Sequence, residues 1–133
     1  HCHRPGRSPR RPTPLGGELA YLAQVVESGQ LAGNGPFTRR CQALLREATG
    51  AAAALLTHSA TAALEMAAIL AGVGPGDEVI MPSFTFCSTA NAVALRGGVP
   101  VFENVRPDTL NLDEGLIEAA ITPRTRAICV VHY

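Results

Sequence analysis

The sequence predicts an α/β fold in which a largely parallel β-sheet is covered by helices on both faces. The first observation behind this prediction is that short apolar runs alternate along the chain with segments of helical periodicity. Such alternation is typical of βαβ units, whose crossover connections are right-handed. The second observation is composition: of 133 residues, 47% are hydrophobic and 17% are charged, which indicates one ordinary domain with a buried core.

Two helices are expected before the first strand. Residues 1–13, rich in proline, arginine and glycine, should form an irregular tail, either disordered or an artefact. Residues 17–27 and 37–49 carry apolar side chains at helical spacing, and a polar, glycine-rich loop at 28–36 separates them. Gly50 should end the second helix, as glycine does at many helix C-termini. The side chains of the second helix expected to face inward are Cys41, Leu44 and Leu45.

The rest of the chain alternates between strands and helices. The strands are expected at residues 52–56, 79–81, 100–105 and 127–131, and the helices at residues 61–71, 85–95 and 113–120. The helix at 61–71 is almost entirely apolar, which predicts burial between layers. Asn111 or Asp113 should cap the last helix, because short polar side chains favour that position.

Composition also argues against several classes of function. The formal net charge is zero, which disfavours a nucleic-acid partner. No apolar run reaches the roughly 18 residues of a membrane span. Four widely spaced cysteines disfavour a zinc site, and Cys41, Cys87 and Cys129 are expected to be buried thiols in the reducing cytoplasm. The side chains of the terminal His1-Cys2-His3 could bind a metal ion. An unstructured tail is the favoured interpretation, so no metal site is expected.

The turn from Ser59 to Ala62 is the best-placed candidate for ligand binding. It follows an expected strand and opens a helix, where free N–H groups and the positive end of the dipole favour a phosphate. Thr61 offers a hydroxyl and an amide, Ala62 offers a second amide, and the small side chains permit close approach. Plain N-capping by Ser59 or Thr61 explains the same residues equally well.

Two aromatic residues, Phe84 and Phe86, follow the second expected strand. Either ring could stack on a flat ligand at the carboxyl edge of the sheet. Packing in the core is the simpler interpretation, and the residues alone favour it.

Several motifs carry a family resemblance. They are GNGPFTRRCQ at 33–42, LLTHSATAALEMAA at 55–68, GPGDEVIMPSFTFCSTANA at 74–92, RPDTLNLDEGLIEAAITPRTRAI at 106–128 and VHY at 131–133. In this order and spacing they resemble the DegT/StrS family of sugar aminotransferases, which depend on pyridoxal 5′-phosphate (PLP). The resemblance implies the aspartate-aminotransferase fold, a three-layer αβα large domain. Residues 14–133 would be its N-terminal segment and first part, an incomplete domain cut at both ends.

The resemblance also implies roles for individual residues. Thr61 and Ala62, in the turn that Ser59 begins, match positions that hold the PLP phosphate. Phe86 matches the aromatic residue that stacks on the pyridine ring. The resemblance therefore favours Phe86 over Phe84 as the stacking residue. The loop residues Asn34, Gly35 and Phe37 match a segment near the substrate entrance.

The chain contains no lysine, since all eleven of its basic side chains are arginine. By resemblance, the family's Schiff-base lysine and the aspartate that pairs with the pyridine nitrogen lie beyond Tyr133. No catalytic residue is therefore expected within this chain, and the chain alone should be inactive.

The function implied by the resemblance is transfer of an amino group from L-glutamate to a dTDP-4-keto-6-deoxyhexose. The complete enzyme would be a cytoplasmic homodimer serving nucleotide-sugar and surface polysaccharide biosynthesis. Two alternatives stay open: an aminotransferase for another nucleotide-linked keto sugar, and a remnant that binds a phosphate ligand without catalysis.

Overall fold

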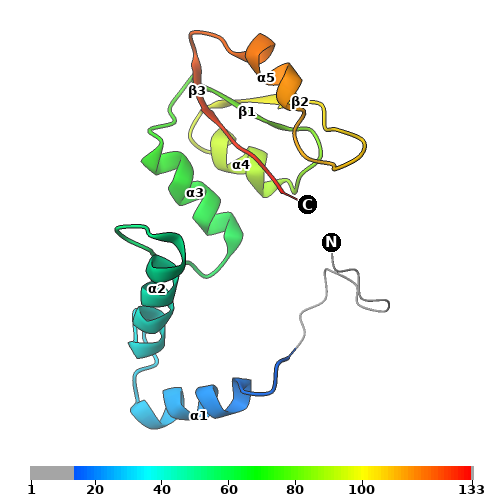
Figure 1. The fold of residues 1–133 in the computed structure, drawn as a ribbon. Helices are drawn as coiled ribbons and strands as arrows, with labels where there is room; N and C mark the ends of the chain where they lie inside the picture. Colours follow the sequence, from blue (N-terminus) through cyan, green and yellow to red (C-terminus); the bar gives the residue numbers. More distant parts are fainter. Residues whose placement is uncertain (1–13, 133) are drawn as a thin grey trace. The chain divides into compact units, whose positions relative to one another are not determined.

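The computed structural model describes residues 14–132. They form two compact units, and the boundary in the chain falls between Leu56 and Thr57. The first unit contains helices α1 (Glu18–Ser28) and α2 (Pro36–Thr49). The second contains helices α3 (Ala60–Leu70), α4 (Ser88–Ala94) and α5 (Glu114–Ala120) and strands β1 (Glu78–Pro82), β2 (Val99–Glu103) and β3 (Thr125–Ile128) (Figure 1). The irregular tail expected at residues 1–13 lies outside the described residues.

Both helices of the first unit lie where the sequence places them. Helix α1 ends at Gly29 and α2 ends at Gly50, and both glycines adopt the left-handed conformation that favours glycine, with φ of 66° and 70°. Pro36 stands at the first turn of α2, where its missing N–H removes no helical hydrogen bond.

The inward side of α2 is only partly as expected: Cys41 and Leu44 face the groove toward α1, but no residue of the helix is buried. Cys41 is exposed, and Leu44 and Leu45 are 64% and 42% exposed. No residue of α1 or α2 is buried within the described unit, because two helices alone cannot enclose a core.

The strand expected at residues 52–56 is also wrong, since the structure has irregular backbone there. A strand needs a hydrogen-bonded neighbour, and this alanine-rich segment finds none among the described residues.

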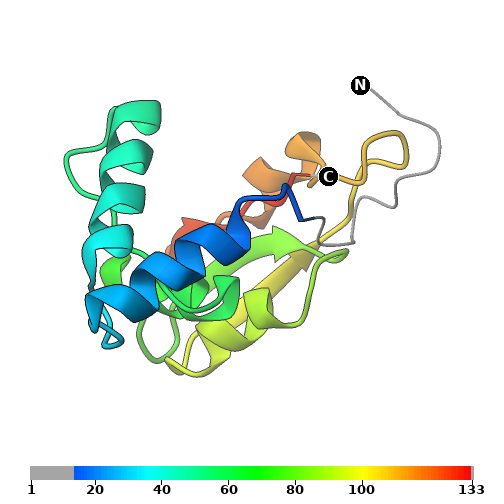
Figure 2. The same cartoon turned by 90° about the horizontal axis from the view of Figure 1, so that it is seen from below.

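The second unit is built on a three-stranded, fully parallel sheet with the order β2-β1-β3. The parallel sheet expected from the sequence is confirmed, and its three strands each lie within two or three residues of their expected bounds. The chain passes from β1 to β2 through α4, and from β2 back across β1 to β3 through α5. The two crossovers run in opposite directions along the sheet, and parallel crossovers are right-handed. Helices α4 and α5 therefore lie on opposite faces of the sheet (Figure 2).

Strand β1 is the centre of the core, and all five of its residues are buried. Val79 and Met81 pack with Val93 of α4 and Ala68 of α3 on one face, while Ile80 points to the opposite face and is fully buried. Helix α3 packs against α4, but its burial is less than expected: Ala68 is its only buried residue, and Leu70 is 83% exposed.

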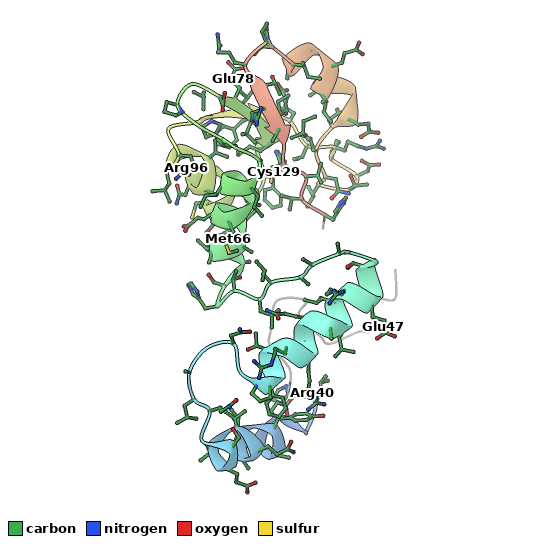
Figure 3. The ribbon with its side chains drawn as sticks, turned by 90° about the vertical axis from the view of Figure 1, so that its left-hand side faces the viewer. Arg40, Glu47, Met66, Glu78, Arg96 and Cys129 are labelled. Carbon is green, nitrogen blue, oxygen red and sulfur yellow. The ribbon has the colours of Figure 1, made fainter. Side chains whose placement is uncertain are left out.

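Polar contacts tie the ends of these elements together. Glu78 is buried at the start of β1 (Figure 3). It accepts hydrogen bonds from the Thr122 hydroxyl and from the Arg124 guanidinium, which also forms an ion pair with it. Arg126 of β3 donates from Nε to the Ala71 carbonyl at 2.8 Å, which satisfies the C-terminal end of α3. Asp113, rather than Asn111, caps α5 by accepting from the Gly115 amide at 3.0 Å.

Candidate functional site

The turn that opens α3 contains the first group of candidate residues. Ser59 is the N-cap in an extended conformation, and its Oγ accepts a hydrogen bond from the Ala62 amide at 3.1 Å. Thr57 stabilises the same turn, because its hydroxyl donates to the Ser59 carbonyl at 2.7 Å. N-capping by Ser59 is therefore confirmed. The Ser59 hydroxyl uses only a lone pair in this cap, so its own hydrogen stays available to a ligand.

The start of α4 supplies a partner that the sequence analysis missed. Ser88 is only 7% exposed, and its hydroxyl lies 2.8 Å from the hydroxyl of Thr61, a residue 27 positions earlier. The next residue, Thr89, is equally buried and pairs through its hydroxyl with Thr85 at 2.9 Å. The signal that could have revealed Ser88 is its place just after β1, since consecutive helices of a parallel sheet begin at the same edge.

Phe86 lies in the loop between β1 and α4, two residues before Ser88. It is 72% exposed, and Phe84 is 43% exposed. Core packing, the interpretation that the residues alone favoured, is thus wrong for Phe86. A large ring held open to solvent beside a strand end is available to stack on a planar ligand.

The turn at α3 fits the phosphate group of a cofactor such as PLP. The amides of Ala62 and Ala63 both donate to Ser59, so the Ala62 amide, expected as a donor to the phosphate, is already used in the cap. Among the described residues, the amides of Ala60 and Thr61 have no hydrogen-bond acceptor. These two amides, the hydroxyl hydrogen of Ser59 and the positive end of the helix dipole are all suited to an anion. The Thr61 hydroxyl joins them when Ser88, and not Thr61, is the donor in the bond between their hydroxyls. Ala60 and Ala62 add no bulk that would keep a phosphate away. The free donors of this turn suit a phosphate ester, and the exposed Phe86 lies in the loop that leads from β1 to Ser88.

The expected substrate-entrance residues lie in the first unit, where each has a structural role. Asn34 adopts a left-handed conformation with φ of 60°, and its carbonyl accepts from Arg39 Nη1 at 3.1 Å. Gly35 is the N-cap position of α2. Phe37 meets the ring of Tyr21 edge-to-face, with centroids 5.7 Å apart. A role of Asn34, Gly35 and Phe37 in binding substrate stays a prediction.

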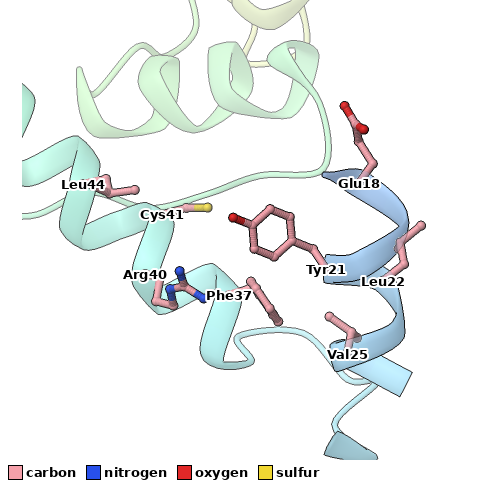
Figure 4. Close-up of a pocket in the computed structure, with 8 residues that line it drawn as sticks. All are labelled: Glu18, Tyr21, Leu22, Val25, Phe37, Arg40, Cys41 and Leu44. Carbon is pink, nitrogen blue, oxygen red and sulfur yellow. The ribbon is translucent and has the colours of Figure 1, made fainter. Parts of the chain in front are cut away.

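The rings of Phe37 and Tyr21 lie in a shallow groove of about 550 Å³ between α1 and α2 (Figure 4). The Arg40 guanidinium lies 5.2 Å from the Phe37 ring centroid, a cation–π contact at the rim. The rest of the lining is mostly apolar and includes Leu22 and Leu44, with the carboxylate of Glu18 as its other charged group. This groove is the exposed inner side of a helix pair and brings together no set of reactive groups.

A smaller apolar cavity of about 240 Å³ lies in the second unit, where α3 and α4 approach β1 and β3. Cys129 lines it, and burial raises the pKa of this thiol, which makes it less reactive at neutral pH. The expectation of buried thiols is wrong for Cys41 and Cys87, both of which are exposed. All three described cysteines are free.

The described residues offer little for other kinds of site. Between residues 14 and 132, no helix is long and apolar enough to cross a bilayer. Within the same range, no three His, Cys, Asp or Glu side chains gather in a way that could hold a metal ion. The terminal His1-Cys2-His3 lies outside the described residues.

Comparison with known proteins gives consistent matches along nearly the whole chain. The sequence model of the DegT/DnrJ/EryC1/StrS aminotransferase family matches residues 16–133. The spore coat polysaccharide biosynthesis protein SpsC of Bacillus subtilis is 41% identical over 116 residues, which cover 87% of this chain and 30% of SpsC. The chain therefore spans less than a third of this curated relative.

Solved structures match equally well. 3-Amino-5-hydroxybenzoic acid synthase superposes with a TM-score of 0.84 at 38% identity, covering 95% of this chain and 33% of the synthase. NtdA of Bacillus subtilis, solved with bound cofactor PMP, the pyridoxamine form of PLP, superposes with a TM-score of 0.79 at 37% identity, covering 86% of this chain and 26% of NtdA. These matches confirm the expected fold class, an incomplete aspartate-aminotransferase-like α/β domain.

Proposed function

This chain belongs to the DegT/DnrJ/EryC1/StrS aminotransferase family, and on that premise we propose that it is the N-terminal part of a PLP-dependent sugar aminotransferase. The observation that carries the proposal is the turn of Ser59 and Thr61 at the start of α3, whose first two amides are free, within a family match that spans residues 16–133. Residues 14–133 would supply the first part of the PLP-binding large domain.

The proposed cofactor is PLP, and its phosphate would lie at the start of α3. The Thr61 hydroxyl and amide and the Ser59 hydroxyl would donate to it, while Ala62 would hold Ser59 in place through the cap. Phe86 would stack on the pyridine ring. When bound, PLP supplies an electron sink that lets an amino group pass between carbon skeletons. The presence of PMP in NtdA supports this choice of cofactor.

The proposed reaction moves an amino group from L-glutamate to the keto carbon of a dTDP-4-keto-6-deoxyhexose. Its support is the resemblance of the motifs to those of dTDP-4-amino-4,6-dideoxygalactose transaminase. The name of SpsC supports a place in polysaccharide biosynthesis. Another nucleotide-linked keto sugar is the alternative substrate, and Asn34, Gly35 and Phe37 are proposed to line the substrate entrance in either case.

The remaining parts of the proposal concern the whole enzyme. The Schiff-base lysine would be supplied by a segment that follows residue 133, and the enzyme would act as a cytoplasmic homodimer. The free thiols of Cys41, Cys87 and Cys129 are compatible with a reducing compartment.

Sequencing the source DNA across both ends of the reading frame tests this proposal first. We expect a frame that continues into a segment with an aspartate and, later, a lysine at a strand end. The protein encoded by that frame should form more than one equivalent of 2-oxoglutarate per site from L-glutamate only when a keto sugar is present, because the sugar regenerates PLP. A panel of dTDP- and UDP-linked keto sugars would identify the substrate. A stop codon directly after Tyr133 would contradict the enzyme and favour a remnant that binds a phosphate ligand.

Cofactor binding is testable on the 133-residue chain itself. PMP is the suitable probe, because it has no aldehyde to react with the terminal amine. A ligand that binds only the folded state raises the unfolding midpoint. We expect PMP to raise it and pyridoxamine, which lacks the phosphate, to have a much smaller effect. Thr61→Val should weaken PMP binding and preserve the fold. An unchanged PMP affinity in this variant would rule out the role assigned to Thr61.

A further inference from the structure

The hydroxyl pair of Thr61 and Ser88 has a feature that the proposed function does not explain. The Ser88 side chain is buried, with a fractional exposure of 7%. Among the described residues, its hydroxyl forms a hydrogen bond with Thr61 Oγ1 at 2.8 Å. Thr61 is only half-buried and opens toward the turn proposed to hold the phosphate. Ser88 is thus the more enclosed of the two hydroxyls, and Thr61 is the one that a ligand can reach.

Each hydroxyl has one hydrogen to donate and two lone pairs to accept with, so the pair has two arrangements. If Thr61 donates to Ser88, Thr61 turns lone pairs toward the phosphate, which repel an anion. If Ser88 donates to Thr61, the Thr61 hydrogen is free to point at the phosphate. Only the second arrangement makes Thr61 a donor to the ligand while the pair stays intact.

We propose that Ser88 is a positioning residue for the cofactor phosphate, because it donates to Thr61 Oγ1 and so directs the Thr61 hydroxyl hydrogen toward the phosphate. This inference rests on the proposed function, since it requires a phosphate at the start of α3. A chain of hydrogen bonds from Ser88 through Thr61 to the phosphate also polarises the Thr61 hydroxyl, which strengthens its bond to the anion. Ser88 itself does not contact the ligand.

Thr89 provides a matched control for this inference. It is as buried as Ser88, belongs to the same first turn of α4 and also forms a hydroxyl pair. Its partner is Thr85, however, and not Thr61. Thr89→Val removes one buried hydroxyl without changing the side-chain shape, so it reproduces the structural cost of losing such a pair and leaves the bond to Thr61 in place.

The experiment measures PMP affinity from the ligand dependence of the unfolding midpoint at low protein concentration. It compares the wild-type chain with Ser88→Ala, Thr61→Val, the double variant and Thr89→Val. Loss of one hydrogen bond corresponds to a roughly three- to tenfold weaker affinity, which we expect for Ser88→Ala. The double variant should bind PMP no more weakly than Thr61→Val, because Ser88 acts only through Thr61. Thr89→Val should bind like the wild type.

The outcomes separate this inference from the function on which it rests. If PMP fails to stabilise the wild-type chain, both the cofactor site and the role of Ser88 are overturned. If Thr61→Val binds weakly but Ser88→Ala binds like the wild type, only the role of Ser88 is overturned, and additive losses in the double variant would overturn it as well. Should Ser88→Ala not fold, Ser88→Cys keeps a side chain of similar size that donates poorly, and the same loss is expected from it.

Discussion

At the scale of single residues, close packing decides which side chain a position can hold. Gly98 lies between α4 and β2, against Val73 and Val93 of the core. A Cβ atom at Gly98 would lie 2.8 Å from a methyl carbon of each valine and 3.2 Å from the Val93 carbonyl oxygen. Carbon atoms do not approach so closely, so a larger residue here would have to displace the core.

We predict that Gly98→Ala destabilises the chain by about 1–3 kcal/mol through overpacking. Gly74→Ala is the matched control in the same unit, because its Cβ would meet only Asp77 Oδ2 at an ordinary 3.8 Å. It should leave the free energy of unfolding unchanged or slightly higher, as Gly→Ala does at permissive positions. Urea unfolding followed by circular dichroism measures both, and equal effects of the two substitutions would refute the packing argument.

Single residues of the candidate site differ in how far sequence could predict them. Ser59 and Thr61 were predicted because their signal is local: small hydroxyl residues directly before an apolar helix. Ser88 was missed because its importance depends on α3 packing against α4, a contact between residues 27 positions apart. The exposure of Phe86 was likewise missed from the residues alone, since an aromatic ring after a strand is usually buried.

At the scale of elements, local pattern located most helices and strands but did not predict their burial. β1, β2 and β3 were found because Gly/Pro turns such as Gly74–Gly76 delimit short apolar runs. The strand expected at 52–56 failed because strand formation depends on a neighbouring strand that local sequence does not reveal. The helices α2 and α3 were located correctly, whereas their burial depends on which other elements cover them.

The start of the sheet depends on an ionic contact whose strength varies with pH. The Thr122 hydroxyl, and after it the Arg124 guanidinium, hold the pKa of the Glu78 carboxyl below its ordinary value. A carboxyl whose pKa is lower in the folded state stabilises the fold above its unfolded-state pKa. That stabilisation is lost as the pH falls through the lower, folded-state pKa.

We therefore predict that Glu78→Gln flattens the acid limb of the stability profile. The wild-type unfolding midpoint should fall between about pH 5 and pH 3 more steeply than that of the variant, because only the wild type must protonate this carboxylate. Thr122→Val should give an intermediate slope, since Arg124 still pairs with Glu78 in that variant. Thermal melts at a series of pH values make the measurement, and parallel slopes for wild type and Glu78→Gln would contradict it.

At the scale of the whole molecule, the sheet presents two open edges. Within residues 14–132, β2 and β3 pair only with β1, so the outer side of each carries backbone N–H and C=O groups without a strand partner. Apolar side chains accompany these edges: Phe102 of β2 is 54% exposed and Ile128 of β3 is 43% exposed. Open, apolar strand edges are templates for pairing with another chain.

The 133-residue chain should therefore associate with itself as its concentration rises, through pairing of strand edges. Phe102→Lys should reduce the association measured by static light scattering, because a charge on an edge strand opposes pairing. Val26→Lys is the matched control: it removes an apolar side chain of α1 that is 67% exposed, but leaves both edges of the sheet unchanged. If the two variants reduce scattering equally, general apolar exposure rather than the open edges drives association. A wild-type chain that stays monomeric at high concentration would contradict the prediction altogether.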